Sequence, residues 1–71
     1  MVEMSEIKVG DIFYVSGDSN RFVVTGIKKG DQDVGMSTAR VSHIQMESIG
    51  DNPSLFNYTY RHHWKCYRLN I

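Results

Sequence analysis

The chain has 71 residues, with eight acidic and eight basic side chains and a formal net charge of zero. A chain this short buries only about 60% of the surface that its unfolded form exposes. We therefore expect one domain, residues 1–71, with a compact core and a stability of about 3–5 kcal/mol. Because this stability is small, the sequence is also compatible with a homo-oligomer, which would bury more surface. A neutral chain lacks the overall field that attracts polyanions, which disfavours strong non-specific binding to nucleic acid.

The cysteine content and the N-terminus bear on the cellular compartment. A single cysteine, Cys66, forms no internal disulfide, as is typical of proteins from reducing compartments. The first six residues include Glu3 and Glu6 and lack the apolar run of a signal peptide. No apolar stretch approaches the roughly 20 residues of a membrane span. The sequence thus predicts a cytoplasmic protein without a membrane partner.

A β-hairpin is predicted near the N-terminus. Residues 11–16 and 21–27 are dense in β-branched and aromatic side chains, and residues 17–20 between them are turn formers. Gly26 inside the second strand predicts a bulge or a sharp bend. Residues 1–8 are expected to form either a short N-terminal arm or one helical turn, because the segment is too short for a helix of its own.

The remainder of the chain predicts further short strands. Residues 28–33 are expected to be a polar turn, and residues 38–47 a strand with either a bulge or a strong twist near residues 42–43, where the apolar positions change face. Residues 49–54, which include Pro53, predict a loop. From residue 56 onwards aromatic side chains alternate, although Tyr60, Trp64, Tyr67 and Ile71 also fit a helical stripe. Aromatic density favours strands over 58–60 and 65–70, separated by a turn at 61–64.

The predicted fold class is therefore mainly β. Four or five short antiparallel strands with at most one helical turn are expected to form either a small barrel or a strongly bent sheet. Closure of the sheet would protect the exposed edges of so small a structure.

One segment supports a more specific expectation. Residues 9–15, which begin Val9-Gly10-Asp11, followed by residues 23–27, resemble the opening hairpin of small Src-homology-3-like barrels of the KOW and Tudor type. The resemblance covers residues 8–28. It implies a barrel that binds peptides or nucleic acid and seldom catalyses reactions. A short, neutral chain with four tyrosines is also similar in style to the small accessory proteins of bacteriophages.

The sequence predicts neither a metal site nor a catalytic site. His62, His63 and Cys66 supply the ligand types that zinc prefers, but a structural zinc site usually takes two spaced ligand pairs and only one cluster is present. A nucleophilic Cys66 would need a histidine base and a third group that orients it. The six glycines are scattered singly and form no phosphate-binding loop. We therefore predict no enzyme activity, no metal and no cofactor.

The most informative segment for function is residues 58–68, where aromatic and basic side chains alternate. Such a segment is found where proteins bind single-stranded nucleic acid and where they bind other proteins, but it also occurs as the core of a very small domain. The candidate binding residues are Tyr60, Arg61, His62, His63, Trp64, Lys65 and Arg68, together with Arg21, Lys28 and Lys29.

The sequence therefore predicts a small, non-enzymatic binding module. The first hypothesis is a protein–protein interaction module, such as a phage-encoded inhibitor or modulator of a host protein. The alternative is a nucleic-acid-binding β-barrel that uses the basic and aromatic C-terminal segment. Zero net charge favours the first hypothesis.

Overall fold

The computed structural model describes residues 1–69, and for Val34 the backbone only. Within this range six antiparallel strands form one sheet in the order β1-β6-β2-β3-β4-β5. The elements are β1 (Val2–Glu3), the 3₁₀ turn η1 (Met4–Glu6), β2 (Ile12–Val15), β3 (Phe22–Val34), β4 (Ser37–Ser48), β5 (Leu55–Arg61) and β6 (Lys65–Leu69). The predicted mainly β class is confirmed. The predicted four or five strands are wrong, because β1 has only two residues and too short a pattern to detect.

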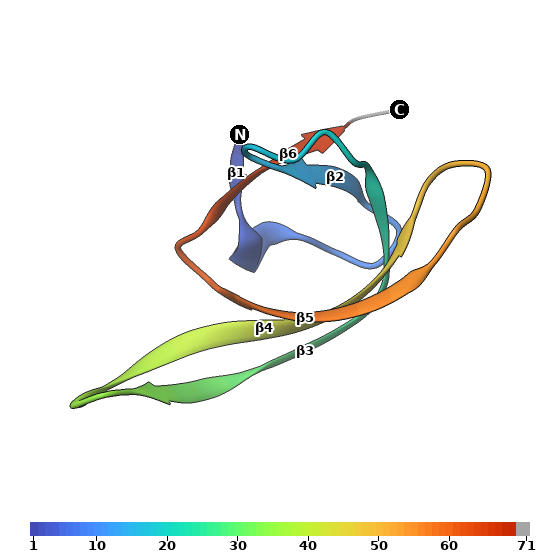
Figure 1. Cartoon of the computed structure of the whole chain (residues 1–71). Coiled ribbons are helices and arrows are strands. Elements are labelled where there is room, and N and C mark those ends of the chain that lie inside the picture. The colour runs from blue at the N-terminus through green and yellow to red at the C-terminus, as the bar shows by residue number, and fades with distance from the viewer. Residues whose placement is uncertain (70–71) are drawn as a thin grey trace.

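The sheet is strongly bent (Figure 1). Strands β1, β6 and β2 lie across from β3, β4 and β5, with the apolar core between them. The bend in β3 coincides with a register shift against β4 between Val24 and Gly26, which confirms the bulge predicted at Gly26. Of the two alternatives predicted near residues 42–43, the bulge is wrong. The β3–β4 ladder runs through Ser42 and His43 without a shift in register, although the neighbouring residues Val41 and Ser42 are both buried.

Strands β3 and β4 extend beyond the body of the molecule as a two-stranded ribbon (Figure 1). The polar turn predicted over residues 28–33 is wrong, because these residues pair with β4 and the turn lies at residues 35–36. Residues 28–33 are exposed, so water reaches both faces of the ribbon. A strand solvated on both faces has no apolar alternation, and its polar sequence therefore resembles a loop.

The C-terminal segment consists of strands, as the aromatic density predicted. Strand β5 is longer than the predicted 58–60, and β6 ends at Leu69, so the predicted strand residue Asn70 lies outside the described residues. The alternative helical stripe included Ile71, which also lies outside them. The predicted turn is present at residues 62–63, and the loop predicted at residues 49–54 contains no strand.

The N-terminal segment is part of the core. Met4 and Ile7 are 1% and 2% exposed and pack in the same cluster as Phe13, Ile44 and Met46. The backbone N–H of Met4 donates a hydrogen bond to the carbonyl of Trp64 at 2.7 Å. The segment expected as an arm or a helical turn therefore forms β1 and η1 and covers one end of the bent sheet.

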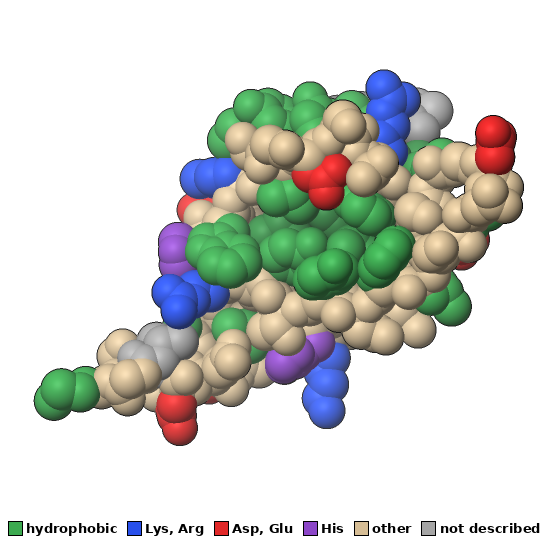
Figure 2. Space-filling view, in the orientation of Figure 1, with side chains coloured by type: hydrophobic (Ala, Val, Ile, Leu, Met, Phe, Trp, Pro, Cys, Tyr) green, Lys and Arg blue, Asp and Glu red, His purple; other side chains and the backbone are tan. Residues whose placement is uncertain are grey.

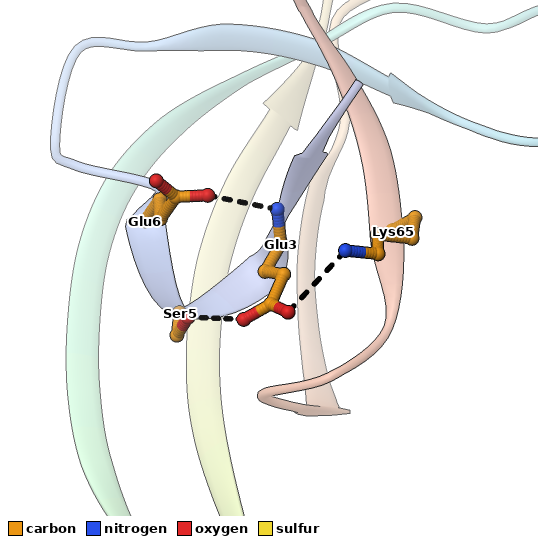
Figure 3. A network of polar contacts seen from close by, with 4 residues as sticks. All are labelled: Glu3, Ser5, Glu6 and Lys65. Carbon is orange, nitrogen blue, oxygen red and sulfur yellow. Dashed lines mark hydrogen bonds and ion pairs between the residues drawn. The ribbon is translucent and has the colours of Figure 1, made fainter.

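Side chains also hold this segment in place (Figure 3). Glu3 accepts a hydrogen bond from the Ser5 hydroxyl at 3.4 Å and forms an ion pair with Lys65 at 3.3 Å. The backbone N–H of Glu3 donates to the Glu6 carboxylate at 3.1 Å. The Lys65–Glu3 pair is exposed, so it contributes less to stability than the burial of Met4.

Replacement of Met4 by alanine tests the role of the N-terminal segment. We expect Met4→Ala to lower the free energy of unfolding by about 2–5 kcal/mol, because a fully buried side chain leaves a cavity. Chemical denaturation measures this change. Val9→Ala is the matched control, since Val9 is 64% exposed and the change should be close to zero. A Met4→Ala variant as stable as the Val9→Ala variant would show that residues 1–7 do not belong to the core.

Candidate functional site

A row of aromatic rings runs along one face of β5. Side chains two residues apart lie on the same face of a strand, so Phe56, Tyr58 and Tyr60 are neighbours. Their ring centroids are 6.1 Å and 5.9 Å apart, and Trp64 in the following turn lies 6.1 Å from Tyr60. We call Phe56, Tyr58, Tyr60 and Trp64 the aromatic row.

The aromatic row begins in the core and ends in water. Phe56 contacts the buried ring of Phe22 edge-on at 6.0 Å. Tyr58 and Trp64, in contrast, are 50% and 44% exposed. Aromatic side chains that bury one part and expose another are enriched where proteins bind partners.

A hollow of about 440 Å³ opens beside the aromatic row. Its walls are β5 on one side and the β2–β3 loop on the other, and its lining residues are Val15, Asp18, Asn20, Phe22, Met46, Ser48, Phe56, Tyr58 and Tyr60. Figure 2 shows hydrophobic side chains gathered on this face of the molecule, above β5 and below β2 and β6. The hollow therefore offers an apolar floor with polar groups at its rim.

The β2–β3 loop holds the polar rim in a defined shape. Gly17 has φ of +88°, a conformation that residues with a Cβ rarely adopt. The turn is closed by a bond from the Asp18 N–H to the Val15 carbonyl at 3.0 Å. The Asp18 carboxylate in turn accepts a hydrogen bond from the Asn20 N–H at 2.9 Å. These bonds fix a negative charge at the rim, opposite β5.

Tyr60 is held in its neutral form. Burial, with smaller contributions from the nearby Tyr58 and Asp18, raises the pKa of Tyr60 to about 12. A neutral phenol keeps its proton and can donate a hydrogen bond into the hollow.

The predicted basic residues do not form one surface. The structure brings together Tyr60, Arg61, His63 and Trp64: the Arg61 guanidinium lies 6.0 Å from the centre of the Trp64 ring, and the His63 ring lies 6.5 Å from it. His62 is half-buried, and its Nε2 is buried without a hydrogen-bond partner among the described residues.

The other predicted basic residues are engaged elsewhere or lie apart. Lys65 pairs with Glu3, Arg68 lies 4.0 Å from the Asp11 carboxylate, and Lys29 donates to the Ser5 carbonyl at 3.4 Å. Arg21 is exposed in the residue directly before β3. Lys28 lies in a second, shallower hollow of about 410 Å³, whose lining includes His43 and Thr59.

Some members of the site were not among the predicted binding residues. Phe56 and Tyr58 belong to the same alternation that identified Tyr60, and this signal was available in the sequence. Asp18 and Asn20 gave no such signal, because turn formers are common in loops that bind nothing. Only the bending of the sheet places their loop opposite β5.

Cys66 lies in the core and not in the hollow. It is 0% exposed, on the strand that pairs with both β1 and β2. Burial raises the pKa of its thiol, which keeps it protonated, whereas a cysteine nucleophile requires an accessible thiolate. Within residues 1–69 no three His, Cys, Asp or Glu side chains gather in a way that could hold a metal ion.

Comparison with family models, with curated proteins and with solved structures found no match to this chain. No helix among the described residues is long and apolar enough to cross a membrane.

The raised pKa of Tyr60 has a consequence for stability at alkaline pH. Above about pH 10 the tyrosine of the unfolded chain ionises, while Tyr60 in the folded chain stays neutral until about pH 12. This contribution to stability is therefore complete below pH 10 and is lost as the pH rises towards 12. We expect Tyr60→Phe to show a smaller loss of stability than the wild type between about pH 9 and about pH 11 in urea unfolding. An identical pH dependence in both proteins would contradict the assigned environment of Tyr60.

Proposed function

We propose that this protein is a non-enzymatic module that binds another protein through the aromatic row and the hollow beside it. The observation that carries the proposal is the continuous row of four rings, which leaves Tyr58 half-exposed at the opening of a preformed apolar hollow. Binding energy at protein interfaces is concentrated in a few Tyr, Trp and Arg side chains, and Tyr58, Trp64 and Arg61 lie together here.

The chemistry of the rim favours a protein partner over a nucleic acid. Both ligands use exposed rings, but a nucleic acid also needs cations that are free to meet its phosphates. Lys65, Arg68 and Lys29 are already engaged within the chain, and the carboxylate of Asp18 lies at the rim of the hollow. The partner expected here is a segment that inserts an apolar side chain into the hollow and places a donor near Asp18.

The fold proposed for this module is the Src-homology-3-like type. Support comes from the strand order, in which β2, β3, β4 and β5 are consecutive neighbours and β6 returns to pair with β2. The single 3₁₀ turn and the bent β3 agree with such an arrangement.

Selection from a library of random displayed peptides tests the proposed function. We expect selected peptides to quench or shift the fluorescence of Trp64, the one tryptophan, and to bind Tyr58→Ala about tenfold more weakly or worse. Met36→Ala is the matched control, because Met36 is fully exposed at the tip of the β3–β4 ribbon and its loss should leave affinity unchanged.

Two outcomes would contradict the proposal. One is a selection whose peptides bind Tyr58→Ala and Met36→Ala as well as they bind the wild type. The other is a salt-sensitive quenching of Trp64 by a single-stranded oligonucleotide in the absence of peptide binding, which would establish the nucleic-acid alternative.

A further inference from the structure

Strand β5 has a free edge. The sheet ends at β5, which pairs with β4 on one side and with no other strand among residues 1–69. The opposite end of the sheet is the two-residue β1, which is too short to attract another strand. Strand β5 has seven residues and lacks the usual protection of edge strands by proline or by an inward-pointing charge.

The ladder with β4 fixes which backbone groups face this free edge. Ser48 N–H donates to Ser54 O, and His62 N–H donates to Arg40 O, so the hydrogen-bonded pairs fall on even-numbered residues of β5. Because antiparallel ladders alternate, the odd-numbered residues direct their N–H and C=O groups away from β4. These residues are Leu55, Asn57 and Thr59, since the Arg61 carbonyl is already bonded to the Trp64 N–H.

Exposed apolar side chains concentrate along the same edge. Among the described residues seven large hydrophobic side chains are exposed, and three of them lie on β5 or in the turn that follows it: Leu55, Tyr58 and Trp64. An exposed edge strand with apolar side chains is a template for pairing with another strand.

The charges at the two ends of β5 are complementary. The segment before β5 carries Asp51, whereas Arg61 is the last residue of β5 and His63 lies in the turn that follows. Neither Asp51 nor Arg61 has an ion-pair partner among the described residues, which leaves both charges available. When two β5 strands pair antiparallel, the acidic segment before β5 in each copy lies beside the basic end of β5 in the other copy. Two-fold symmetry gives two such contacts in each dimer.

We propose that the occupant of the β5 edge is a second copy of this chain, which forms a two-fold symmetric dimer with one continuous sheet. The two Asn57 residues lie at the axis and exchange backbone hydrogen bonds, and Leu55 of each copy pairs with Thr59 of the other. Phe56 then lies opposite Tyr58 of the second copy, so the two aromatic rows join. This inference concerns association of the chain with itself and does not depend on the proposed function.

Sedimentation equilibrium of the full chain, from about 10 μM to about 1 mM, tests the proposal. We expect the wild type to reach twice the chain mass of 8.2 kDa with rising concentration. Asn57→Pro should remain at the single-chain mass, because proline removes an N–H that points away from β4 and leaves the β4–β5 ladder intact. Asn57→Thr is the matched control: it keeps the N–H and should still dimerise.

A charge exchange provides a second route that does not rely on proline. Arg61→Asp and Asp51→Arg should each weaken dimerisation about tenfold or more, since each places like charges together across the interface, and the double variant should restore it. A wild type that stays at the single-chain mass throughout overturns the proposal. So does an Asn57→Pro variant that is folded by circular dichroism and still dimerises, or a double variant no better than the single ones.

Discussion

The pairing of β6 with β2 determines the rest of the structure. Tyr14 lies opposite Tyr67 and Val15 opposite Cys66, so β6 lies beside β2, more than 50 positions earlier in the chain. On its other side β6 pairs with β1, which brings Met4 and Ile7 over the core. Because β6 is enclosed between β1 and β2, it cannot cover β5, and β5 becomes the edge of the sheet. One long-range contact thus closes the core and leaves the aromatic row at the border between core and water.

The position of the aromatic row explains how one segment serves both stability and recognition. Phe56 packs against the buried Phe22, whereas Tyr58 and Trp64 keep about half of their surface in contact with solvent. A chain of 71 residues has few large side chains to spare for a binding surface alone. The core and the candidate binding surface therefore share the same row of rings. Residues 58–68 are neither entirely core nor entirely binding surface.

Local features of the sequence predicted much of the fold. Strand β2, the turn after it and the bulge at Gly26 follow from β-branched residues and glycines that act within a few positions of each other. The β3–β4 ribbon was not predictable in this way, because a strand solvated on both faces has the composition of a loop. Strand β1 was not predictable either, since its two residues are ordered by β6, more than 60 positions away.

The candidate site was predictable only in part, for the same reason. Tyr60, Arg61, His63 and Trp64 are close in sequence and remain together in space. Lys65 and Arg68 belong to the same sequence cluster, yet they pair with Glu3 and Asp11 from the opposite end of the chain. The acidic N-terminus and the basic C-terminus therefore neutralise each other in part, and a cluster of charges in the sequence does not become a cationic surface.

Amide hydrogen exchange along β5, measured by NMR at low and at high protein concentration, tests the account most directly. The structure predicts alternation at low concentration: the amides of Phe56, Tyr58 and Tyr60 are protected by β4, while those of Leu55, Asn57 and Thr59 exchange rapidly. At high concentration the second set should become protected as well. Uniform protection of β5 at low concentration would contradict the account, because it would mean that another part of the chain already covers this edge.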